Sequence, residues 1–210
     1  MTLTAGAALA AAERAAPLID RLASHGFAVA ETFFDRDLCR LLEVETAALA
    51  TDPTAIDAGV GREGGHVTDP SIRRARIRWL DGQTAAQKHF LAEAEYLRTA
   101  INQALFLGLF SFEAQFALTP SGGFYARHVD SFSGRRNRIV SLVAYLSPDW
   151  RQEDGGCLRI WPSEGAPSFI DIVPQCGTLV LMLSEEIPHE VLPCHRPRAS
   201  IAGWFRVSTP

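Results

Sequence analysis

The stretch GTLVLMLSEEIPHEVLPCHRPRASIAGWFRV (residues 177–207) decides the fold class. It contains three short runs rich in apolar and β-branched residues, Gly177–Leu183, His189–Leu192 and Ala199–Val207. Prolines and charged residues separate these runs. Short apolar runs bounded by turn-forming residues are typical of β-strands. The C-terminal part of the chain is therefore predicted to consist of strands.

The same pattern extends upstream to residue 111, with a new run every eight to twelve residues. The five further predicted strands are Phe112–Leu118, Gly123–Val129, Arg138–Ser147, Cys157–Trp161 and Ser168–Val173. About eight short strands without intervening helices favour a sandwich, barrel or jelly roll. We expect residues 111–207 to form this β core.

Residues 1–110 have a different, mostly helical pattern. Asp35 can cap a helix from about Arg36 to Ala50. Apolar residues at three- and four-residue spacing predict a second, longer helix from about Thr84 to Leu107. We expect these helices to pack on one outer face of the β core as its support.

Three further features of the first half are expected. Short strands are predicted at Gly26–Glu31 and Ala75–Leu80, and the alanine-rich N-terminus is predicted to be a frayed or docking helix. Between the strands, residues 51–71 are rich in Gly and Asp. So long a loop indicates either disorder or a mobile functional lid.

Composition limits the class of protein. The chain has 210 residues, 47% of them hydrophobic, and a formal net charge of −4, which fits one globular catalytic domain over residues 1–210. No apolar run is long enough to span a bilayer, and the acidic total does not favour nucleic acid as a partner. The four cysteines form no CxxC pair, and the N-terminus lacks the basic segment of a signal peptide, so a cytoplasmic location is expected.

His128-Val129-Asp130 ends one predicted strand. Residues i and i+2 of a strand point to the same face, so the imidazole and the carboxylate can share a ligand. His189, at the start of a later strand, is a third candidate. Two histidines and one carboxylate on one side of a metal form the facial triad of non-haem Fe(II) oxygenases. Two alternatives remain: a solvated His–Asp pair at a strand end, and a His189 that is a satisfied core histidine.

Arg198 starts the last predicted strand, nine residues after His189. An arginine that points into a barrel is unfavourable unless it meets an anion, and a guanidinium suits a carboxylate. Ser200 lies on the same face and could add a hydroxyl donor. The alternative is that Arg198 forms an internal salt bridge with a protein carboxylate.

Seven segments together resemble a known family. They are ARIRWLDG (Ala75–Gly82), YARHVD (Tyr125–Asp130), AYLSPDW (Ala144–Trp150), GGCLRIWP (Gly155–Pro162), FIDIVP (Phe169–Pro174), PHEVLP (Pro188–Pro193) and RASIAGWF (Arg198–Phe205). The chain resembles the 2-oxoglutarate- and Fe(II)-dependent prolyl hydroxylases, above all the oxygen-sensing (hypoxia-inducible-factor type) branch and its bacterial relatives. The implied fold is a double-stranded β-helix (jelly roll, cupin-like), mainly β within an α+β chain, with supporting N-terminal helices.

The resemblance implies roles for individual residues. The iron ligands of the family fall on His128, Asp130 and His189, and the arginine and tyrosine that hold the far carboxylate of 2-oxoglutarate fall on Arg198 and Tyr145. Ser200 is the further co-substrate candidate named above. The apolar wall of the co-substrate pocket falls on Val143, Leu158 and Val191.

Two positions depart from the oxygen-sensing branch. Leu118 stands where that branch carries a tyrosine close to the iron, and Ala202 replaces a hydroxyl residue near the metal. Both departures predict a less polar metal pocket. The stretch Gly59–Asp69 falls where the family has a mobile loop that covers the substrate.

Substrate contacts are expected from Arg138, Tyr125 and Trp204. Arg138 falls where the family has a substrate-side arginine; for Tyr125 and Trp204 the alternative is ordinary packing. The sequence also contains two arginine clusters, which are either solvated faces or a positive rim of the pocket. They are Arg73, Arg74, Arg76 and Arg78, and Arg135, Arg136 and Arg138.

The resemblance implies an oxidoreductase, a dioxygenase that hydroxylates an unactivated C–H bond with Fe(II), 2-oxoglutarate and O2, and with ascorbate as an optional reductant. The expected substrate is a prolyl residue of a cytoplasmic protein or peptide, such as a translation factor or ribosomal protein, and succinate and CO2 are the co-products. The alternatives are a hydroxylase of a free amino acid or other small molecule, and a non-enzymatic metal-dependent sensor or interaction module.

Overall fold

The computed structural model describes residues 5–59, 69, 71–131 and 137–207, and only the backbone of residues 5–12. Its α-helices are α1 (Ala5–His25), α2 (Arg36–Ala47) and α3 (Ala85–Leu105). The strands of the N-terminal half are β1 (Phe27–Ala30), β2 (Ile56–Asp57) and β3 (Arg76–Trp79). The strands of the C-terminal half are β4 (Ser111–Thr119), β5 (Tyr125–His128), β6 (Arg138–Tyr145), β7 (Leu158–Ile160), β8 (Ile170–Ile172), β9 (Leu179–Leu183), β10 (His189–Val191) and β11 (Arg198–Arg206).

Helices α2 and α3 each begin at a side-chain cap, and the cap of α2 is the predicted one. The Asp35 carboxylate accepts hydrogen bonds from the backbone N–H groups of Asp37 and Leu38 and so starts α2. This helix ends three residues earlier than predicted, because Ala48–Ala50 form a 3-10 turn. Thr84 caps α3 in the same way, by accepting from the N–H of Gln87.

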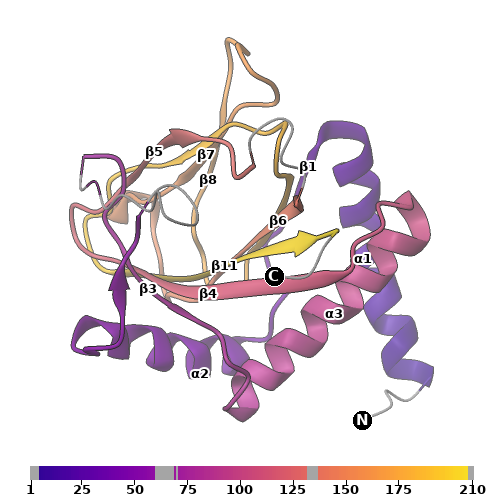
Figure 1. Cartoon of the computed structure of the whole chain (residues 1–210), viewed down its shortest axis with the longest axis horizontal. Helices are drawn as coiled ribbons and strands as arrows, with labels where there is room; N and C mark the ends of the chain where they lie inside the picture. The colour runs from indigo at the N-terminus through magenta and orange to yellow at the C-terminus, as the bar shows by residue number, and fades with distance from the viewer. Residues whose placement is uncertain (1–4, 60–68, 70, 132–136, 208–210) are drawn as a thin grey trace.

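The strands form two antiparallel sheets, which face each other around a central space (Figure 1). The large sheet has the order β1-β9-β6-β11-β4-β3-β2, and the small sheet has the order β5-β10-β7-β8. Each of the eight predicted C-terminal runs overlaps one of these strands to within two residues at either end. The fold is thus the predicted double-stranded β-helix with N-terminal helices; that it acts as one catalytic domain stays a prediction.

The helices cover the outer face of the large sheet, as α2 and α3 do below β4 and β11 in Figure 1. Alternation along β11 explains this arrangement. Ala199, Ile201 and Phe205 point to the helices and are buried there, while Arg198 and Ser200 point to the space between the sheets. The sheet therefore presents an apolar face to the helices and a partly polar face to the interior.

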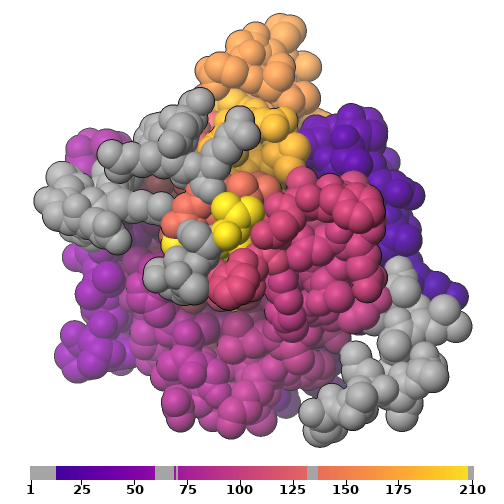
Figure 2. Space-filling model, turned by 45° about the vertical axis from the view of Figure 1, so that its right-hand side comes forward, coloured from indigo at the N-terminus to yellow at the C-terminus, as the bar shows by residue number. Residues whose placement is uncertain are grey.

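A smaller apolar core lies between the two sheets, built around Tyr145, Leu158 and Val180. At one side of it, the connection between β7 and β8 projects from the molecule (orange in Figures 1 and 2). Packing between the sheets closes one part of the interior and leaves the remainder as a cavity.

The predicted loop 51–71 needs a correction. Ile56 and Asp57 form β2, which pairs with Ile77 and Arg76 at the edge of the large sheet. The expected covering loop Gly59–Asp69 lies almost entirely outside the described residues. In the part of the chain that the structure describes, no helix combines the length and apolar character needed to cross a membrane.

Candidate active site

A cavity of about 470 Å³ lies between the inner faces of the two sheets. Strands β4, β6 and β11 of the large sheet line one side, and β5, β7 and β10 of the small sheet line the other. All twelve residues singled out in the sequence line this cavity: Tyr125, His128, Asp130, Arg138, Val143, Tyr145, Leu158, His189, Val191, Arg198, Ser200 and Trp204.

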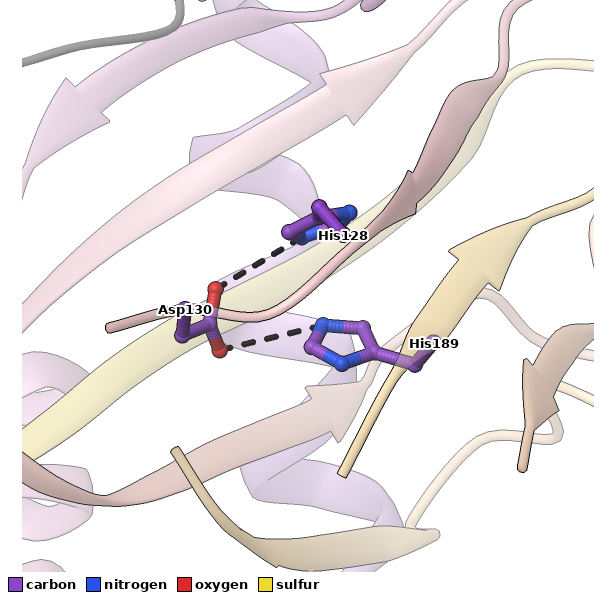
Figure 3. Close-up of side chains that lie close together, drawn as sticks. All are labelled: His128, Asp130 and His189. Carbon is purple, nitrogen blue, oxygen red and sulfur yellow. Dashed lines mark ion pairs between the residues drawn. The ribbon is translucent and has the colours of Figure 1, made fainter. Parts of the chain in front are cut away.

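Three of these residues form a compact ligand set (Figure 3). His128 ends β5, His189 begins the neighbouring strand β10, and the two residues are direct partners across the antiparallel pair. Asp130 Oδ1 lies 3.6 Å from His128 Nε2, and Asp130 Oδ2 lies 3.8 Å from His189 Nε2. One ligand atom of each residue lies within 4.8 Å of the others, so the group could hold a metal ion.

The surrounding groups orient these ligand atoms. His128 Nδ1 lies 2.8 Å from the carbonyl oxygen of Ala126, and His189 Nδ1 lies 3.0 Å from that of Ile187. Because each Nδ1–H can donate to its carbonyl, each Nε2 keeps a free lone pair directed at the site. Buried Ser141 donates a hydrogen bond of 2.5 Å to Asp130 Oδ2 and fixes the carboxylate.

The electrostatics keep Asp130 and His189 in metal-binding protonation states. Burial alone would raise the pKa of Asp130, but His189, His128 and the Ser141 hydrogen bond hold it well below its ordinary value. Burial lowers the pKa of His189, although Asp130 opposes this shift. The carboxylate is therefore ionised and the His189 imidazole neutral, which are the forms that bind metals.

Three residues that line the cavity, Arg198, Tyr145 and Trp204, have a buried polar atom without a hydrogen-bond partner among the described residues, and the first two lie close together. Arg198 is 4% exposed; its Nη1 donates to the carbonyl oxygen of Gly156 at 2.7 Å, but its Nε has no hydrogen-bond partner. The Tyr145 hydroxyl, also fully buried, has none either. Within the described residues no carboxylate pairs with Arg198, so the predicted alternative of an internal salt bridge is not observed. The Arg198 guanidinium carbon lies 5.3 Å from the centre of the Tyr145 ring.

These unpaired donors fit an absent carboxylate ligand. Unpartnered polar groups are unfavourable inside a protein, so a cationic donor and a hydroxyl left open in one cavity indicate an anion that both can bind. Burial, partly opposed by Arg198, raises the pKa of Tyr145 to about 12, so the phenol keeps its proton and can donate. Val143, Leu158 and Val191 supply apolar walls to the same cavity.

Tyr125 lies closer to the metal ligands than strand alternation predicts. Strict alternation would not place residues three apart on one face, but the Tyr125 ring stacks on the His128 ring with centroids 3.6 Å apart. The pairing register between β5 and β10 explains the difference: His128 pairs with His189 while Tyr125 pairs with Val191, so one strand carries an extra residue. Such a bulge brings residues three apart to the same face.

Leu118 is a second correction. Its side chain packs against the core beneath the helices, whereas Gln115, Ala117 and Thr119 of the same strand line the cavity. Leu118 therefore does not line the metal pocket, and the prediction that it makes this pocket less polar is wrong. Ala202 does line the cavity, as expected. Ser141, which holds Asp130, and Gln115 were not identified from the sequence, because neither stands in a recognisable motif.

Comparison with known proteins agrees with this geometry. Residues 114–206 match the 2OG-Fe(II) oxygenase superfamily. A crystal structure of a Pseudomonas putida prolyl-4-hydroxylase is 43% identical to the chain and superposes with a TM-score of 0.83, covering 91% of this chain and 98% of that one. The chain belongs to the 2OG-Fe(II) oxygenase superfamily. This oxygenase is an enzyme of the prolyl hydroxylase type, and it uses Fe(II), 2-oxoglutarate and O2.

Two more distant relatives show how far the similarity extends. The hypoxia-inducible factor prolyl hydroxylase of Caenorhabditis elegans is 28% identical over 203 residues, which cover 90% of this oxygenase but only 27% of the relative. The oxygenase thus spans about a quarter of that protein. A Trichoplax adhaerens prolyl hydroxylase, solved with a peptide of hypoxia-inducible factor, shares the fold with a TM-score of 0.84 at 24% identity, over 98% of this chain and 94% of that one.

Proposed function

We propose that this oxygenase hydroxylates a prolyl residue of a cytoplasmic protein, with succinate and CO2 as co-products. The observation that carries the proposal is the joint presence, in one cavity, of the His128–Asp130–His189 ligand set and of the unpaired donors of Arg198 and Tyr145. A binding module would not need both a metal site and a second, separate anion site.

In this proposal the three ligand side chains hold Fe(II). The backbone carbonyls behind His128 and His189 keep both Nε2 atoms directed at the metal, and Ser141 keeps the Asp130 carboxylate in place. A ligand set of this kind leaves coordination positions open for a co-substrate. When bound, Fe(II) and 2-oxoglutarate supply the oxidative chemistry that moves one oxygen atom of O2 to a C–H bond.

Arg198 and Tyr145 bind the far carboxylate of 2-oxoglutarate in this proposal, with Ser200 as a further donor. All three are buried and line the cavity. A guanidinium offers two parallel N–H donors to a carboxylate, and the neutral phenol adds a third bond. Val143, Leu158 and Val191 exclude water from the remainder of the co-substrate pocket, which strengthens these polar contacts.

The prolyl substrate is proposed from the relatives, since the 43%-identical structure is a prolyl-4-hydroxylase. Tyr125, Arg138 and Trp204 are the proposed substrate-side residues. Arg138 lies over the Trp204 ring, with its guanidinium carbon 3.7 Å from the ring centre. This pair forms a firm wall beside the cavity. A translation factor or ribosomal protein fits the proposed cytoplasmic setting, and ascorbate is proposed as a supporting reductant.

Mass spectrometry of a treated cell extract tests the proposal. The Fe(II)-loaded oxygenase with 2-oxoglutarate should add the mass of one oxygen atom to a prolyl residue of an extract protein. The variant His128→Ala, treated identically, should add none. Oxidation of a free amino acid or another small molecule, with no protein modified, would refute the prolyl substrate and support the small-molecule alternative.

A further inference from the structure

Among the described residues, three arginines line the cavity: Arg73, Arg138 and Arg198. Two of their charges already have a use. Arg198 is assigned above to 2-oxoglutarate. Arg138 forms an ion pair with Glu113, which lies 2.6 Å from Arg138 Nη2 and also accepts a hydrogen bond from Arg206. Arg73 is therefore the cavity cation that remains without an assigned anion.

The backbone of Arg73 is fixed by the sheet, while its guanidinium has no acceptor among the described residues. Its backbone forms a β-bridge with Tyr125, and the neighbouring Arg74 N–H donates to the carbonyl oxygen of Phe124 at 3.0 Å. The guanidinium carbon lies 4.7 Å from the centre of the Tyr125 ring. No described residue accepts a hydrogen bond from the guanidinium or forms an ion pair with it.

The other arginines of the same cluster differ from Arg73. Arg76 donates to the backbone carbonyls of Ala50, Asp52 and Ala55, and Arg78 forms an ion pair with Asp52 at 2.7 Å. Those two side chains hold the edge of the large sheet to the segment after α2. Of the four arginines in the cluster, Arg76 and Arg78 are structural, Arg74 is exposed, and Arg73 is the one that lines the cavity.

The surroundings of Arg73 favour an anionic ligand. The charges that act on it are the positive groups Arg138 and Arg198 and the carboxylate Asp130, and Asp130 is already engaged by the two histidines. The Tyr125 ring contacts both the His128 ring and the Arg73 guanidinium, and no described contact joins Arg73 to the three ligand residues directly, so we place Arg73 in the wall of the cavity beside the metal site. A guanidinium with five free donors pairs best with a carboxylate.

We propose that Arg73 is a specificity-determining residue, which binds an acidic side chain of the substrate close to the prolyl residue that is hydroxylated. The inference rests on the proposed prolyl hydroxylation. A carboxylate of the substrate would lie against Arg73 while the proline occupies the space beside the metal ligands. The oxygenase would then prefer prolines with an aspartate or glutamate nearby.

Paired peptides test this preference. The substrates are a series of capped peptides, each with one proline and one aspartate. The position of the aspartate varies along the series, up to about four residues, or about 13 Å of extended chain, on either side of the proline. Each has a matched peptide with asparagine at that position. The proteins are the Fe(II)-loaded full chain and its variants Arg73→Gln and Arg73→Lys. Arg74→Gln is the matched control, because Arg74 is exposed and does not line the cavity. The measurements are kcat/KM for each peptide and succinate release without peptide.

The unmodified chain should favour aspartate over asparagine by about 10-fold at one position, which corresponds to about 1.4 kcal/mol. Arg73→Gln should lose this preference, so that its kcat/KM becomes the same for the aspartate and the asparagine peptide. Arg73→Lys should keep part of the preference, and Arg74→Gln all of it.

Three outcomes overturn the inference. The first is an Arg73→Gln variant that keeps the preference for aspartate. The second is an equal loss of activity on both peptides, which would show that Arg73 only positions Tyr125. The third is an unmodified chain with no preference at any position. If the unmodified chain converts 2-oxoglutarate but oxidises none of the peptides, the proposed prolyl function itself fails.

Discussion

Replacement of Arg198 by methionine should separate co-substrate binding from the stability of the fold. The guanidinium is 4% exposed and has one hydrogen bond, from Nη1 to Gly156, while its Nε lacks a partner. Buried charges replaced by apolar side chains of similar volume often leave stability unchanged or raise it by about 1–4 kcal/mol. We therefore expect Arg198→Met to unfold, without 2-oxoglutarate, at the same temperature as the unmodified protein or above it.

The effect of 2-oxoglutarate should differ strongly between the two proteins. At a concentration of about 100 times Kd, the ligand stabilises the unmodified protein by about 2.7 kcal/mol. Loss of the charged hydrogen bonds to one carboxylate, worth about 2–3 kcal/mol, weakens binding roughly 100-fold. The same concentration then stabilises the variant by only about 0.4 kcal/mol. For a chain of this size the Tm shifts are about 5–11 °C and about 1–2 °C.

The assay is thermal unfolding of the Fe(II)-loaded proteins without O2, with and without 2-oxoglutarate. Arg196→Met is the matched control, because Arg196 is a part-exposed arginine that pairs with Asp154 and does not line the cavity. A full ligand-induced Tm shift in Arg198→Met would refute the role of Arg198. A large loss of stability without ligand would show instead that Arg198 mainly holds the Gly156 segment.

Two further substitutions test the surroundings of the site. Ser141→Ala removes the 2.5 Å hydrogen bond to Asp130 Oδ2 and should weaken Fe(II) binding about 10- to 100-fold in a metal titration; unchanged affinity would refute this role. Tyr145→Phe tests how the stability of the fold depends on alkaline pH, since burial raises the pKa of Tyr145 to about 12 from 10.0. Between these values the unfolded chain releases the phenol proton and the folded chain keeps it, so stability falls as pH rises. The unmodified protein should lose about 2–3 kcal/mol more of its unfolding free energy than Tyr145→Phe over this range, and equal losses would contradict the expectation.

The β core could be predicted from the sequence because its strands are short, apolar and separated by turn residues. The sequence also predicts which side chains of β11 face the cavity, since Arg198 and Ser200 alternate with buried apolar residues. By contrast, β2 has two exposed residues and no apolar pattern, and it forms only where β3 offers a free edge. A strand of that kind depends on its partner, which the sequence does not show.

Three features of the site could not be predicted from the sequence: the direction of Leu118, the position of Tyr125 and the contact of Ser141 with Asp130. The strand that contains Leu118 is buried on both faces, so its sequence lacks the alternation that would show which side chains reach the cavity. The position of Tyr125 depends on a bulge, which shifts the alternation by one residue. The contact of Ser141 with Asp130 joins segments eleven residues apart whose proximity depends on the sheet topology.

The most direct test of the central claim uses isotopically heavy O2. The Fe(II)-loaded chain is incubated with 2-oxoglutarate and a cytoplasmic extract, and both the succinate and the modified protein are analysed by mass spectrometry. We predict that one heavy oxygen atom enters succinate and the other enters a hydroxyprolyl residue, and that His189→Ala yields neither product. Oxygen derived from water in the hydroxyl group, or undiminished succinate from His189→Ala, would contradict the assignment of the cavity as the oxygenase site.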